Sequence, residues 1–147
     1  MDYKETKHLV EAYTSAMNLV FRRVTSVMNE KVHKELTTDQ FGTLRYLYQN
    51  ESCTSSDIAN EFAIGKSAVT AQINRLVDRG FIERVRDESD RRVVFLHLTE
   101  EGKQLVEKGN EKLYEVLGDV LSHFEKEEVT NIIEKLEKLA DILEHKE

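Results

Sequence analysis

The stretch that decides the fold is residues 54–98, which read TSSDIANEFAIGKSAVTAQINRLVDRGFIERVRDESDRRVVFLHL. A short helix is predicted from Ser55, because apolar side chains then recur at the helical period. Ala63-Ile64-Gly65 breaks that helix, and a second one is predicted from about Ser67. The inner face of the second helix carries Val69, Ile73, Leu76 and Val77. Two short helices joined by a tight turn indicate a helix-turn-helix.

Beyond Gly80, which is placed to end the second helix, the apolar period changes to two. Residues 81–85 and 93–98 therefore predict two strands, the only ones expected in the chain. The charged residues 86–92 lie between them as a hairpin tip. A hairpin that directly follows a helix-turn-helix predicts a winged helix-turn-helix.

Long helices are predicted on both sides of this unit. Residues 5–31 carry apolar side chains over so much of the helix circumference that burial on more than one side is expected, with a partner chain as the natural covering. Thr37 and Gln40 form a capping box for the next helix, which ends near Gln49. Thr99 caps another long helix, and a last one starts near Glu125.

The predicted fold class is therefore mainly α: a winged helix-turn-helix with a small β-hairpin wing, flanked by N- and C-terminal dimerisation helices. The expected division is 1–35 for the N-terminal dimerisation helix, 36–98 for the winged helix-turn-helix DNA-binding lobe, and 99–147 for the C-terminal dimerisation helices.

Composition excludes several classes of protein. The chain has 147 residues, about the length of one domain. No apolar run approaches the ~18 residues of a membrane span, and no signal-peptide core opens the chain. A single cysteine fits a reducing cytoplasm. The sequence lacks the motifs that usually mark a metal, cofactor or catalytic site: paired CxxC motifs, HxxxH or HExxH pairs, Gly-rich phosphate loops and nucleophile elbows. We therefore expect no such site.

The outer face of the second short helix holds the candidate DNA contacts. Short side chains there allow close approach to base edges: Asn74 can pair with adenine, Ser67 and Thr70 can contact several bases, and the Ala71 methyl can meet a thymine methyl. Lys66 and Arg75 suit phosphates, which set the register. The alternative is an ordinary solvated helix face, and the wing argues against it.

The hairpin tip carries three further candidates. Arg92 is expected to enter the minor groove and Arg91 to contact the DNA backbone. Asp90 is expected to shape the wing by hydrogen bonding to a neighbouring arginine. A charged turn that merely keeps the hairpin hydrated is the alternative interpretation.

With these residues identified, the chain resembles the MarR family of bacterial regulators. The resemblance rests on INRL at 73–76, GFIER at 80–84, DRR at 90–92 and LTEEG at 98–102. It implies an obligate homodimer on a pseudo-palindromic site of double-stranded DNA, with Arg92 in the minor groove and Thr70 with its neighbours in the major groove. Ala71 departs from the family, where many relatives carry a longer polar side chain, so base readout there is expected to be weak or apolar.

The net charge of −7 argues against a nucleic-acid partner until it is divided along the chain. Residues 66–92 hold seven basic and five acidic residues, a net charge of +2. Residues 99–147 hold seven basic and fourteen acidic residues, a net charge of −7. The acidity therefore lies mainly away from the predicted DNA face.

The resemblance also implies an effector, a small aromatic or phenolic molecule bound between the dimerisation helices and the DNA-binding lobe. Five side chains lie on helices that can line such a pocket, although plain core packing is the alternative for each: Tyr13, Met17, Arg22, Tyr46 and Tyr48. The expected function is a cytoplasmic transcription regulator, a repressor that a ligand releases from its operator.

Two other functions stay open. One is a winged-helix module that binds protein instead of DNA. The other is a redox-responsive regulator switched by Cys53, for which a small buried thiol is the competing interpretation.

Overall fold

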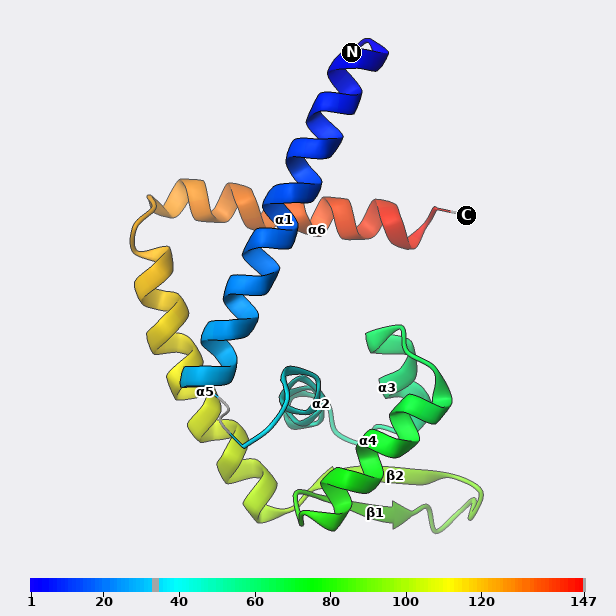
Figure 1. The fold of residues 1–147 in the computed structure, drawn as a ribbon. Coiled ribbons are helices and arrows are strands. Elements are labelled where there is room, and N and C mark those ends of the chain that lie inside the picture. Colours follow the sequence, from blue (N-terminus) through cyan, green and yellow to red (C-terminus); the bar gives the residue numbers. More distant parts are fainter. Residues whose placement is uncertain (33–34, 147) are drawn as a thin grey trace. The chain divides into compact units, whose positions relative to one another are not determined.

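The structure, a computed structural model, describes residues 1–32 and 35–146. Its elements, labelled in Figure 1, are α1 (Tyr3–Lys31), α2 (Thr38–Gln49), α3 (Ser55–Phe62), α4 (Lys66–Asp78), β1 (Ile82–Arg86), β2 (Val94–Leu98), α5 (Glu100–Leu121) and α6 (Lys126–Glu144). The predicted fold class is confirmed: helices dominate, and a two-stranded antiparallel hairpin follows the helix-turn-helix.

The chain forms two compact units, Met1–Lys112 and Leu113–Glu147. The first contains α1 to α4, the hairpin and the N-terminal half of α5. The second contains the rest of α5 together with α6. The expected division at 1–35, 36–98 and 99–147 concerns functional parts, and it stays a prediction.

Capping boxes fix where α1, α2 and α3 begin. Thr37 accepts a hydrogen bond from the backbone N–H of Gln40 and starts α2, as predicted. Thr54 does the same for α3. Asp2 and Glu5 form a further box, with bonds of 2.8 and 2.9 Å, so α1 begins at Tyr3 and not at the predicted Glu5.

The apolar core of the first unit lies where the winged helix meets the start of α5. Buried side chains come from α2, α3, α4, both strands and α5; the most enclosed are Leu44, Ile58, Val69, Ile73, Leu76, Ile82, Leu96 and Val106. Helix α1 contributes little to this core, since Met28 is its one buried side chain. The expectation that α1 is covered on more than one side is therefore not met within a single chain.

The hairpin pairs Ile82 with Leu98 and Arg86 with Val94. Each strand begins one residue later than predicted. A further bridge joins Cys53 to Leu96, whose backbone N–H donates to the Cys53 carbonyl at 2.7 Å. This isolated bridge lies outside the two predicted strands, which are the strands of the described residues. A single residue between two helices has no alternating pattern, so the sequence does not reveal it.

The junction between the hairpin and α5 is unusually close. The Thr99 hydroxyl donates to the Gly80 carbonyl at 2.6 Å and accepts from the Gly102 backbone N–H at 3.1 Å. The φ of Gly80 is +80°, the left-handed conformation predicted for the end of α4. A Cβ atom on Gly102 would lie 2.2 Å from the Phe81 carbonyl oxygen. Only glycine therefore fits at position 102 without moving backbone.

Among the described residues, no helix has the length and apolar character needed to cross a membrane.

We predict that Gly102→Ala lowers the free energy of unfolding by about 1–3 kcal/mol, the usual cost of overpacking a rigid contact. Chemical denaturation followed by circular dichroism measures the change. Gly118→Ala is the matched control, because no atom lies within 4 Å of a Cβ there apart from its chain neighbours and the backbone of its own helix. The control should stabilise the protein by up to about 1 kcal/mol, because alanine favours helix over glycine. Equal stability of the two variants would contradict the close contact.

Candidate nucleic-acid interface

The turn between α3 and α4 depends on local backbone geometry, and a long-range contact with α2 then holds α4 itself. Ala63 ends α3 with φ of +51°, and the Ile64 N–H donates to the Ala59 carbonyl at 3.1 Å. The Thr43 hydroxyl, on α2, donates to the Gln72 side-chain oxygen at 2.5 Å. Because Thr43 is almost fully buried, this bond fixes the rotation of α4 about its own axis.

With α4 held in this way, its two faces separate cleanly. Val69, Ile73 and Leu76 are buried. Every side chain predicted to contact DNA from this helix is exposed, namely Lys66, Ser67, Thr70, Ala71, Asn74 and Arg75. The face is therefore free of the protein core and lined by short polar side chains and two cations.

Asn74 has a partner that sequence reasoning missed. The Arg84 guanidinium, on β1, donates a hydrogen bond to the Asn74 side-chain oxygen. Both side chains are exposed. Arg84 is part of the GFIER stretch, yet nothing in the sequence indicates which residue of α4 it meets, because that depends on how the hairpin twists against the helix. The bond joins wing strand and helix at the candidate interface.

The wing tip is ordered around Asp90. Its carboxylate accepts three hydrogen bonds from Arg92: from the backbone N–H at 3.1 Å, from Nε at 3.1 Å and from a terminal guanidinium nitrogen at 3.2 Å. These bonds lower the pKa of Asp90 below its ordinary value. The Arg92 side chain is nevertheless 91% exposed. The tip thus presents an exposed cation that is hydrogen-bonded to Asp90.

Arg86 supports the same tip from the end of β1. Its guanidinium donates to the Arg91 carbonyl at 2.6 Å. The Asp87 backbone N–H donates to Val93 at 2.9 Å, and the Val93 N–H donates to the Asp90 carbonyl at 3.0 Å. Arg91 and Arg92 are both exposed on this closed loop. Arg86 was not among the residues singled out from the sequence.

We predict that Asp90→Asn lowers affinity for DNA several-fold, because the amide loses the charge that orients the Arg92 guanidinium. Fluorescence anisotropy with a labelled duplex measures the effect. The matched control is Glu88→Gln, an exposed neighbour with the same charge change. Glu88→Gln should raise affinity slightly, since it removes a negative charge near phosphates. A rise for both variants would show that Asp90 acts only as a charge.

The contact between Asp90 and Arg92 depends on pH, and the sign of that dependence follows from the pKa of Asp90. Because the Asp90 pKa is lowered in the folded protein, the carboxylate contact is complete at pH values above the ordinary range of aspartate. It is lost as the pH falls through the lowered pKa.

The five residues predicted to line an effector pocket have separate surroundings. Tyr13, Met17 and Arg22 are exposed on α1. The Tyr46 ring packs edge-on against Phe62 at 5.9 Å between ring centres.

Tyr48 differs from the other four. Its hydroxyl donates to the Glu107 carboxylate of α5 at 3.1 Å. It also lines a cavity of about 320 Å³ between the end of α2, the Asn50–Ser52 loop, β2 and Lys103. In the described part of the chain, the other four predicted pocket residues do not line this cavity.

The thiol of Cys53 is enclosed. The side chain is 4% exposed, and Sγ donates to the Asn50 carbonyl at 3.3 Å. Burial, and then the nearby charge of Asp57, raise the pKa of this thiol. Since the thiolate is the reactive form, this environment favours an inert structural cysteine over a redox switch.

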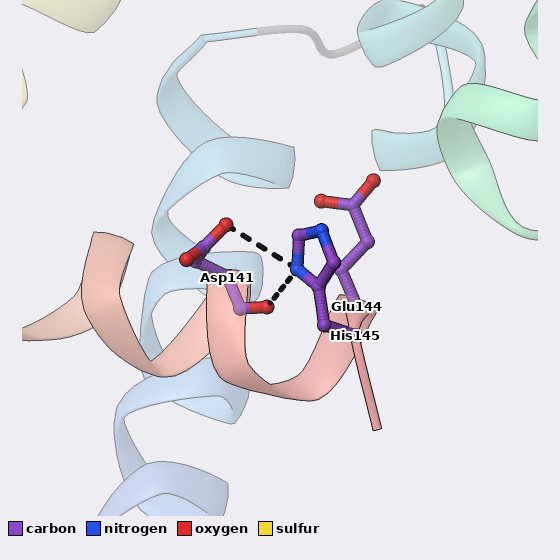
Figure 2. Close-up of side chains that lie close together, drawn as sticks. All are labelled: Asp141, Glu144 and His145. Atoms are coloured by element: carbon purple, nitrogen blue, oxygen red, sulfur yellow. Dashed lines mark hydrogen bonds and ion pairs between the residues drawn. The ribbon is translucent and has the colours of Figure 1, made fainter. Parts of the chain in front are cut away.

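Figure 2 shows a group of possible ligand atoms at the end of α6, from Asp141, Glu144 and His145. These atoms lie within 4.8 Å of one another, and all three residues are exposed. The His145 Nδ1 lies 2.8 Å from the Asp141 carbonyl oxygen, one of the last carbonyls of the helix. We interpret the group as a helix end capped by a histidine side chain.

Known proteins that are similar to this chain are transcriptional regulators. The MarR family profile matches residues 36–94, which run from the start of α2 to the start of β2. The HTH-type transcriptional regulator YpoP of Bacillus subtilis is 30% identical over 120 residues, which are 82% of this chain and 85% of the relative.

Solved structures extend the likeness to nearly the whole chain. The transcriptional regulator BldR of Sulfolobus solfataricus has a TM-score of 0.77 and 26% identity over 96% of this chain and 99% of its own. Streptococcus pneumoniae FabT, solved in complex with DNA, has a TM-score of 0.76 and 27% identity over 95% of this chain and 97% of its own.

Proposed function

The chain belongs to the MarR family of transcription regulators, and from this premise we propose that it binds double-stranded DNA as a homodimer at a pseudo-palindromic site. The family and the curated relatives are transcriptional regulators and not enzymes. In each subunit α4 enters the major groove, and the wing enters an adjacent minor groove.

The observation that carries this proposal is the exposed polar face of α4 next to an ordered cationic wing tip. Ser67, Thr70, Ala71 and Asn74 form the part of that face short enough for contact with base edges. Lys66, Arg75 and Arg91 are assigned to phosphates, and Arg92 to the minor groove. The net charge of +2 over residues 66–92 is small, so we expect modest affinity with a strong dependence on salt.

We predict that Arg92→Ala and Arg91→Ala each weaken DNA binding, and that Arg91→Ala also reduces the slope of log affinity against log salt by about 0.9, because one phosphate contact is lost. Anisotropy titrations at several salt concentrations measure both quantities. Lys108→Ala is the control, since it removes an exposed cation of α5 outside the proposed interface. Arginine variants that bind DNA as tightly as the unmodified protein would favour the alternative of a protein-binding module.

The dimer is supported by apolar surface that a single chain leaves in water. Helix α1 exposes Leu9, Val10, Tyr13, Met17, Val20, Phe21 and Val24, and Phe21 reaches 71%. Helix α6 separately exposes Ile132, Ile133, Leu136, Ile142 and Leu143. Stripes of this size on a DNA-binding regulator are best covered by a second copy of the same chain.

We predict a dimer by analytical ultracentrifugation and a shift to monomer, with loss of DNA binding, for Phe21→Glu. A carboxylate in an apolar interface costs far more than it does in water. Ser15→Glu is the control, because helical geometry places residue 15 on the opposite side of α1 from the apolar stripe. Dissociation of both variants, or of neither, would contradict an interface along that stripe.

We further propose that the protein acts in the cytoplasm as a repressor released by a small aromatic or phenolic effector. Two recognition helices fit successive major grooves only when they lie about 34 Å apart. An effector that changes this spacing lowers affinity for the operator. Tyr13, Met17, Arg22, Tyr46 and Tyr48 remain the residues proposed to line its pocket, although within one chain Tyr48 lines a cavity that the other four do not line. Gel-shift titration of fragments next to its own gene, with and without phenolic ligands, tests both steps; absence of a preferred fragment contradicts operator binding.

A further inference from the structure

Asn74 is the one side chain on the exposed face of α4 for which the structure records a hydrogen bond to the wing strand. A free asparagine amide offers one acceptor, its oxygen, and two N–H donors. Here the acceptor already receives a hydrogen bond from the Arg84 guanidinium. The bond is charge-assisted, since arginine stays protonated, and such bonds are among the stronger side-chain contacts. The Asn74 amino group takes no part in this bond.

The bond from Arg84 to the Asn74 oxygen affects base recognition, because asparagine uses that oxygen to recognise adenine. The side-chain oxygen accepts from the adenine N6 amino group while the amide nitrogen donates to N7. An adenine amino group at Asn74 would have to displace Arg84 or share one oxygen with a cationic donor. Guanine presents two acceptors in the major groove, O6 and N7, and no donor. The amino group of Asn74 matches that edge without breaking the bond to Arg84.

We propose that Arg84 sets the base preference of Asn74, converting an adenine-reading side chain into a donor that favours guanine. Arg84 acts here as a positioning residue, through Asn74. The inference rests on the proposed DNA binding, and it differs from the adenine contact expected from the sequence alone.

The test is selection of bound sites from random duplexes, followed by affinity measurements on single-base variants. Asn74→Ala first identifies the base that Asn74 faces, as the position where selectivity disappears. At that position the unmodified protein should prefer guanine over adenine by about tenfold, within the range of a good base contact. Arg84→Met removes the donor and keeps an unbranched side chain of moderate length, so the preference should move to adenine.

Arg86→Met is the matched control. It removes the same charge from the same strand, but its partner is the Arg91 carbonyl at the wing tip. It should lower affinity for all sites by a similar factor and leave the base preference unchanged. Asn74→Asp is a second variant that keeps a partner for Arg84 and removes the donors; it should abolish the guanine preference even if Arg84→Met is poorly folded by circular dichroism.

The outcomes distinguish the proposed role of Arg84 from the proposed DNA binding. Adenine preference in the unmodified protein, guanine preference that survives both Arg84→Met and Asn74→Asp, or an Asn74→Ala variant that loses selectivity at no position would each overturn this inference while DNA binding stands. Selection that enriches no sequence would overturn the proposed function itself.

Discussion

The contact between Gly102 and the Phe81 carbonyl is the constraint on which the arrangement of the winged helix depends. At this point the first turn of α5 approaches the backbone that leads from α4 into β1, with no room for a Cβ atom. Thr99 closes the same junction by bonding to the Gly80 carbonyl. The end of the helix-turn-helix, the base of the wing and the start of the long helix therefore share one rigid joint. The first turn of α5 is therefore held against the base of the wing.

Much of this fold can be predicted from the sequence, because its signals are local. Capping at Thr37, the left-handed Gly80 and the change of apolar period after it each depend on a few neighbouring residues. Contacts between distant segments leave no such pattern. The Cys53–Leu96 bridge and the Arg84–Asn74 bond depend on how the hairpin twists and packs, which single-sequence periodicity does not report.

The candidate site likewise has one part that the sequence predicts and another part that it does not. Exposure of the α4 face follows from helical geometry once Val69, Ile73 and Leu76 are assigned inward, and the structure agrees. The effector pocket was inferred from a family likeness and from residue type. Tyrosines and methionines serve equally well in core, interface and ligand contacts, so their positions alone do not define a cavity.

The ordered wing tip has a consequence for the thermodynamics of recognition. A long arginine side chain that is mobile in the free protein loses up to about 2 kcal/mol of conformational entropy when a groove immobilises it. In this protein much of that ordering is complete before DNA arrives, because Asp90 and the backbone already restrict Arg92. In the proposed complex, that part of the entropic penalty belongs to folding and not to binding.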